Sequence, residues 1–141
     1  MSGELESHVR FEPPDLCVAV FIGDIDAPLM RRMNDQLRRA AEGRDYIFML
    51  IDQTRAGSIS AEARKLGVEG VKGIHVRDSA VIGASFHVRT IMTLVTRVIR
   101  LVRGEKGELI QFFATEAEAR AYLAERRLTL FGNRGDTAER K

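Results

Sequence analysis

The hydrophobic pattern changes its period along the chain, and these changes predict strands interleaved with helices. Short apolar runs between turn residues predict five strands, at residues 8–12, 16–22, 46–52, 74–82 and 109–113. Apolar residues spaced three and four apart predict four helices, at residues 27–42, 61–71, 86–103 and 116–127. This order is typical of a single α/β domain with a mostly parallel five-stranded sheet, an antiparallel edge strand and about four helices.

The helix boundaries carry local signals. Asp26 and Ser60 are placed to cap the first and second helices, and Thr115 with Glu118 forms a capping box that opens the last one. Pro13 and Pro14 cannot continue a strand ladder, so the first two strands are expected to form an antiparallel hairpin with the first strand at the sheet edge.

The strand at 46–52 organises the rest of the chain. Residues 47–51 are all apolar, which is typical of a central strand covered on both faces, and the run stops at Asp52. A polar stretch, 52–60, then leads into a helix and is expected to be a loop. Functional groups collect at the carboxyl ends of such strands. The candidate partner or ligand site therefore consists of Asp52, Thr54, Ser58, Ser60 and Glu62.

The helix at 86–103 is the longest one predicted. Its basic face contains Arg89, Arg97, Arg100 and Arg103, and its other face is apolar. The pattern favours a helix packed on the sheet with a solvated basic face. A docking surface for an anionic partner, or an interfacial helix on acidic lipid, is the alternative.

Composition narrows the possible functions. The net charge is +2 with no polybasic tract, so a nucleic-acid role is not expected. The one cysteine, Cys17, lies in an apolar strand and is expected to be buried. The amino terminus does not look like a signal peptide and no run is apolar enough to span a membrane, which favours the cytoplasm.

No catalytic or metal-binding set emerges from the sequence. His8, His75 and His87 fall in three separate elements, and there is no nucleophile elbow or dinucleotide fingerprint. No enzyme activity, cofactor or metal is expected. Residues 1–7 are expected to be a polar leader, 8–131 the folded domain and 132–141 a disordered tail.

Several features together resemble the SpoIIAA-like proteins of the STAS superfamily, a family often described together with CRAL-TRIO lipid-binding domains. They are the opening hairpin, the strand that ends at Asp52, the helix that begins with SAEAR at 60–64, and the VIGAS turn at 81–85. The resemblance covers about residues 9–127. It implies a small cytoplasmic regulatory or binding module, usually without catalysis of its own.

The resemblance also implies a phosphorylation switch at the start of the second helix. The family's Asp-Ser-Ser-Gly pattern falls on Ser60, Ala61, Glu62 and Ala63, so alanine occupies the phosphoacceptor position. Ser58 or Ser60 would have to act instead. A phosphate at Ser60 would lie at a helix N-terminus, which favours negative charge.

Two hypotheses of function follow from the sequence. The first is a non-enzymatic STAS-like regulatory or protein-interaction module that binds a protein partner through residues 52–62. The second is a small apolar-ligand or lipid-binding protein with peripheral contact to anionic membrane, suggested by Met30, Met33, Met49 and Met92. A homodimer is compatible with either hypothesis.

Overall fold

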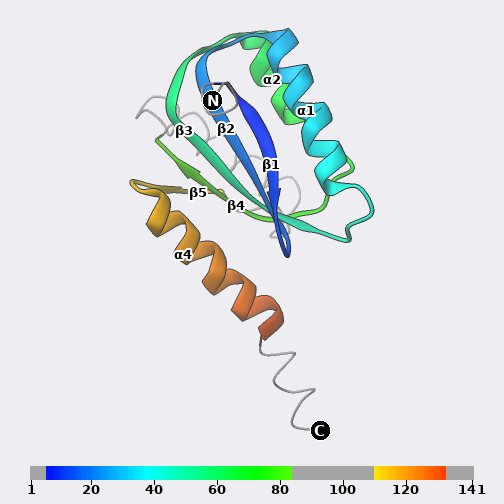
Figure 1. The fold of residues 1–141 in the computed structure, drawn as a ribbon, viewed down its shortest axis with the longest axis vertical. Coiled ribbons are helices and arrows are strands. Elements are labelled where there is room, and N and C mark those ends of the chain that lie inside the picture. Colours follow the sequence, from blue (N-terminus) through cyan, green and yellow to red (C-terminus); the bar gives the residue numbers. More distant parts are fainter. Residues whose placement is uncertain (1–5, 84–109, 133–141) are drawn as a thin grey trace, which may run out of the picture.

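The computed structural model describes residues 6–83 and 110–132, and its elements follow the predicted order (Figure 1). The strands are β1 (His8–Glu12), β2 (Leu16–Ile25), β3 (Ile47–Ile59), β4 (Val76–Ile82) and β5 (Ile110–Phe113). The helices are α1 (Ala27–Ala41), α2 (Ala61–Gly70), α4 (Glu116–Arg127) and a terminal π-helical turn, η3 (Leu128–Gly132).

The five strands form one sheet in the order β1-β2-β3-β4-β5. β1 pairs antiparallel with β2, as the hairpin signal predicted, and the other three neighbouring pairs are parallel. The sheet is therefore mixed, where we expected a mostly parallel one.

Ser7, expected in the polar leader, is buried, and its hydroxyl bridges the backbone N–H and C=O of Ile22 at 2.8 and 3.1 Å.

Two strands run past their predicted ends. β2 continues to Ile25 and β3 to Ile59, and the two stay paired from Leu16↔Phe48 to Ile25↔Ile59 with register shifts between them. The predicted loop at 52–60 is therefore wrong, because residues 52–59 belong to β3. Residues 52–59 are mostly polar because this extension of β3 is partly exposed. Its partly buried Ala56 and Ile59 pack against the core.

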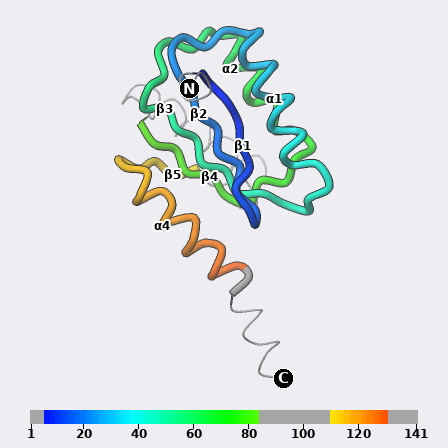
Figure 2. Tube along the Cα trace, in the orientation of Figure 1, coloured from blue at the N-terminus to red at the C-terminus, as the bar shows by residue number. Residues whose placement is uncertain are grey.

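The helices cover both faces of the sheet. α1 and α2 lie side by side on one face, and α4 packs across the other (Figures 1 and 2). Three α-helices are present in residues 6–83 and 110–132, against about four predicted in all. The predicted helix 86–103, with its Arg89, Arg97, Arg100 and Arg103 face, lies outside the described residues.

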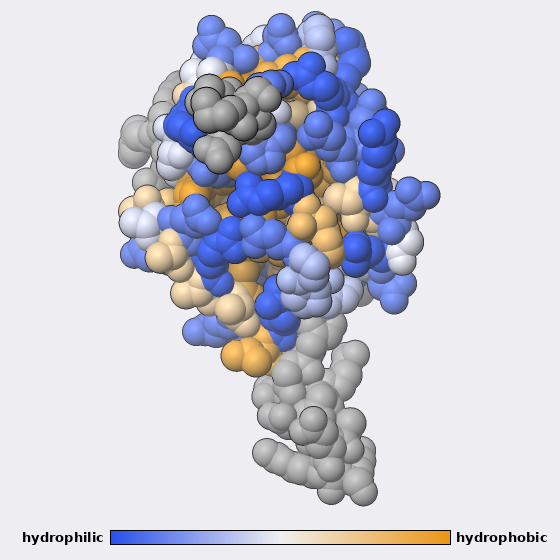
Figure 3. All heavy atoms as spheres, in the orientation of Figure 1, coloured by the Kyte–Doolittle hydropathy of each residue, from blue (hydrophilic) through white to orange (hydrophobic). Residues whose placement is uncertain are grey.

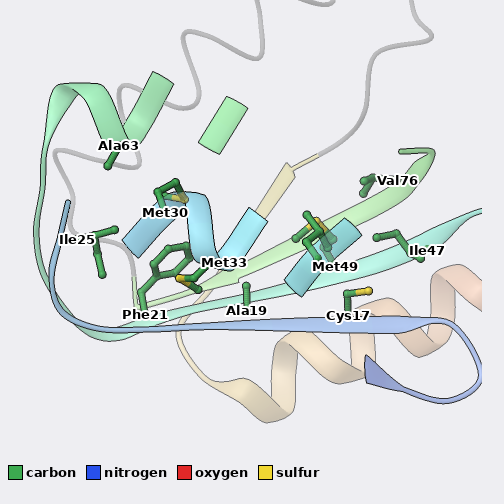
Figure 4. Packing of buried hydrophobic residues seen from close by; sticks show 11 residues of the cluster. Cys17, Ala19, Phe21, Ile25, Met30, Met33, Ile47, Met49, Ala63 and Val76 are labelled. Carbon is green, nitrogen blue, oxygen red and sulfur yellow. The ribbon is translucent and has the colours of Figure 1, made fainter. Parts of the chain in front are cut away.

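The larger apolar cluster fills the space between the sheet and α1 (Figure 4). Cys17, Ala19 and Phe21 of β2 alternate toward this face, and Met30 and Met33 of α1 descend onto them. Met30, Met33 and Met49 are all at most 6% exposed. These methionines pack within the core, in keeping with their helical and strand spacing.

The predicted helix caps are confirmed. The Asp26 carboxylate accepts a hydrogen bond from the Leu29 N–H at 3.0 Å, and the Ser60 hydroxyl accepts one from the Ala63 N–H at 3.0 Å. Thr115 and Glu118 form the complete capping box of α4. These caps fix the residue at which each of the three helices begins.

Glycines bring α1 and α2 close together. A Cβ on Gly70 would lie 2.3 Å from the Asn34 side-chain oxygen, and one on Gly67 would lie 3.4 Å from Met30. The Asn34 amide donates to the Leu66 carbonyl at 3.0 Å across the same contact. Both glycines, which weaken α2 as an isolated helix, are thus used for close packing.

No helix among the described residues is long and apolar enough to cross a membrane.

Candidate functional site

β2, β3 and β4 run parallel, and Asp52 lies on β3 level with the last residue of β4, at the start of the edge along which β2 and β3 extend beyond β4. Asp52 pairs in register with Val20 of β2 and Ile82 of β4. Its carboxylate accepts hydrogen bonds from the Thr54 N–H at 2.9 Å and the Thr54 hydroxyl at 2.6 Å. Two of the predicted site residues are therefore bonded to each other.

Asp24 makes the corresponding contact one strand away. One oxygen of its carboxylate accepts from the Ser58 N–H at 2.9 Å and from the Ser58 hydroxyl at 3.1 Å. A Cβ on Gly57 would lie 2.4 Å from that oxygen, so a side chain at 57 would displace the carboxylate. Asp24, which lies between the predicted strand 16–22 and the predicted helix 27–42, is thus the residue that holds Ser58.

Gly83 lies close against the backbone of Thr54. Its φ of +78° is a conformation that favours glycine, and an added Cβ would lie 2.5 Å from the Thr54 backbone. The backbones of β4 and β3 therefore approach each other more closely here than a side chain would allow. The VIGAS turn requires glycine at this point for both reasons.

Ser60 joins the strand edge to α2. Its N–H donates to the Ile25 carbonyl at 3.0 Å while its hydroxyl caps α2. Glu62, in the first turn, lies 3.4 Å from Arg31 of α1, and both side chains are more than half exposed. An exposed pair of this kind contributes little to stability.

The five predicted site residues thus follow one continuous edge but do not converge on a point. Asp52 pairs with Thr54, Ser58 with Asp24, and Ser60 with its own helix. No group of three His, Cys, Asp or Glu side chains in the described part of the chain is arranged to hold a metal. The edge is a preformed, hydrogen-bonded surface.

An exposed apolar side chain lies on α2, the helix that follows this edge. Val68 of α2 is 64% exposed, and Ala61, Arg64 and Lys65 are exposed on the same outer side of the helix. The sequence did carry a signal for Val68, because it falls on the polar side of the helical pattern. We define the interaction edge as residues 52–62 together with this outer side of α2.

A second polar cluster, which the sequence did not reveal, anchors α4 at the opposite end of the sheet. Asp78 of β4 is fully buried and accepts from the Tyr122 hydroxyl and the Arg126 Nε, both at 2.8 Å. Asp15 is 3% exposed and pairs with Arg127, while accepting from the Tyr46 hydroxyl at 3.0 Å.

These contacts shift the ionisation of the groups around α4. Burial and a hydrogen bond to a carboxylate raise the pKa of Tyr122 and of Tyr46. Arg120 donates to Glu12 at 2.8 and 3.0 Å, and this hydrogen bonding lowers the pKa of Glu12. The cluster joins α4 to the sheet and to the β1–β2 hairpin.

Cys17 is fully buried, as predicted, and burial raises its pKa to about 11. A thiol with such a pKa is almost entirely protonated near neutral pH, and the thiolate is the reactive form. Cys17 therefore serves as a small core residue.

Sheet order and helix placement define the class of the protein as a small α/β domain with a mixed five-stranded sheet. A protein-family model described as SpoIIAA-like matches residues 16–124. The chain belongs to the SpoIIAA-like family, which confirms the resemblance drawn from its motifs.

Solved structures show the same fold. An uncharacterized protein of the DUF3478 family with a SpoIIAA-like fold, from Shewanella loihica PV-4, is 23% identical over 82% of this chain and 90% of its own, with a TM-score of 0.59. The anti-sigma factor antagonist SpoIIAA in its unphosphorylated form is 14% identical over 82% of this chain and 96% of its own, with a TM-score of 0.57. No curated protein matches the sequence.

Proposed function

We propose that this protein is a non-enzymatic interaction module that binds a protein partner through the interaction edge. The observation that carries the proposal is Val68, an apolar side chain 64% exposed, on the helix that follows a strand edge whose polar groups are bonded to one another. A hydrogen-bonded edge holds its shape without a ligand, and preorganisation lowers the cost of binding. An exposed apolar residue with a polar rim is the usual composition of a contact surface.

The same geometry separates the two candidate phosphoacceptors. The Ser58 hydroxyl donates to Asp24, so a phosphate on Ser58 would bring two anions together. The Ser60 oxygen already accepts from a helix N–H, and a phosphate there would keep that role and gain from the helix dipole. Ser60 is therefore the better candidate for a regulatory phosphate.

Site-specific photo-crosslinking tests the proposal. A photoreactive amino acid at Val68 or Ala61 is compared with the same group at Arg38, which is exposed on α1. We expect a discrete crosslinked protein, identified by mass spectrometry, from the α2 positions only. The same products at all three positions, or none at any, would count against the interaction edge.

A pair of serine variants tests the role of Ser60. Ser60→Asp should preserve the fold and change the yield of the crosslinked partner, because it adds charge at the centre of the edge. Ser58→Asp should instead lower the unfolding midpoint, because its carboxylate would face Asp24. Equal behaviour of the two variants in both assays would contradict the distinction between these serines.

A further inference from the structure

The charges of α1 and α2 are strongly unbalanced. The two helices contain six basic and three acidic residues, and all nine side chains are exposed. Their net charge is thus +3 in a chain whose net charge is +2. The basic residues are Arg31, Arg32, Arg38, Arg39, Arg64 and Lys65.

Most of this positive charge is not neutralised within the part of the chain that the structure describes. Arg31 pairs with Glu62, but the other five basic side chains make no ion pair with any described residue. An anionic partner would be attracted to this positive surface from a distance.

The composition of this surface distinguishes between kinds of anionic partner. Neither α1 nor α2 contains an aromatic residue, so nothing here would stack on the bases of a single-stranded nucleic acid. Val68 is the one large hydrophobic residue exposed on either helix, and the surface over α1 is mainly polar (Figure 3). A helix that lies in a membrane interface needs a broad apolar face.

Resting on the proposed function, we infer that the partner presents an acidic protein surface with an apolar residue at its centre. The apolar residue contacts Val68, and carboxylates around it pair with Arg64 and Lys65. The α1 arginines extend the positive field beside this contact and speed the encounter. In the direct contact, the guanidinium group of Arg64 can bind a carboxylate through two parallel hydrogen bonds.

A defined probe tests the chemistry of this surface. The probe is a labelled amphipathic helical peptide with leucine on one face and glutamate elsewhere, and its binding to the full chain is followed by fluorescence anisotropy. We expect binding that weakens as salt screens the charges. Arg64→Gln with Lys65→Gln should raise the Kd about tenfold, as expected for two rim charges.

A matched control separates local contact from overall charge. Gln111→Glu with Thr129→Glu makes the same change in net charge at exposed positions on β5 and η3. The control should leave the Kd within about twofold of the parent. No binding of the glutamate peptide, an equal loss in both double variants, or tighter binding to phosphatidylserine vesicles or duplex RNA than to the peptide would each overturn the inference.

The outcome for the partner's chemistry is separable from the proposed function. A discrete crosslink at Val68 without peptide binding would leave the interaction module standing and reject an acidic partner. Peptide binding without any crosslink would support the surface chemistry and reject the interaction module.

Discussion

Replacing Arg126 with methionine would leave the Asp78 carboxylate buried without its cation. Asp78 is 0% exposed and accepts three hydrogen bonds, from Arg126, from Tyr122 and from the Ser79 N–H at 2.9 Å. Methionine keeps the apolar stem of the arginine, so the packing loss is small. The cost comes from a buried charge that keeps only neutral partners.

The expected loss is about 3 kcal/mol, the lower end for breaking a buried ion pair, because the Arg126 side chain is itself 30% exposed. For a domain of this size that loss lowers the thermal midpoint by about 10 °C. Urea unfolding followed by circular dichroism measures the free energy, and an unchanged slope would show that the unfolded state is not altered.

Two further variants make this measurement decisive. Arg120→Met removes the more exposed pair with Glu12, whose side chains are 36% and 32% exposed, and should cost only about 1 kcal/mol. Asp78→Asn combined with Arg126→Met removes the uncompensated charge and should be more stable than Arg126→Met alone. A loss below about 1 kcal/mol for Arg126→Met, or no recovery in the double variant, would refute the reasoning.

Three other measurements follow from the structure. The raised pKa values of Tyr46 and Tyr122 mean that the neutral phenols stabilise the fold fully below about pH 10, and that this stability is lost as pH rises further; tyrosinate absorbance should therefore appear near pH 10 in urea but only at higher pH in the native protein. Cys17, with a pKa of about 11, should not react with a thiol reagent at pH 8 until the protein is unfolded, and rapid native labelling would show that it is accessible. Gly83→Ala should lower the free energy of unfolding in urea by about 3 kcal/mol, because it adds a steric clash to an unfavourable φ. Gly43→Ala, at a residue with a φ of +76° and open space around it, should lower it by about 1 kcal/mol. Equal losses would contradict the close approach of Gly83 to Thr54.

Features set by neighbouring residues could be predicted from the sequence. The caps at Asp26, Ser60 and Thr115 depend on residues three positions away, and all three were predicted. The burial of Cys17 and the hairpin before it follow from short local patterns in the same way. Local hydrogen bonding and apolar runs are thus enough to define these elements.

Features that depend on distant contacts could not be predicted. The β3 extension resembles a loop, because Gly57 and Ser58 are turn-forming residues, and it is a strand because β2 continues beside it and Asp24 binds Ser58. The anchors of α4 join residues up to 112 positions apart, such as Asp15 and Arg127. No pattern along the chain identifies which of many arginines will meet which carboxylate.

The strand order has a consequence for how the chain is built during synthesis. Each described strand after β1 pairs with the described strand that precedes it, so none of these five has to be inserted between two others. The sheet can grow in one direction as the chain leaves the ribosome, with each new strand added to the latest edge. Near the end of the described residues, α4 returns to the beginning of the chain, where Arg120 and Arg127 meet Glu12 and Asp15. A ribosome-bound chain that ends before α4 should therefore hold a partly formed sheet in which Glu12 and Asp15 still lack their α4 partners, Arg120 and Arg127.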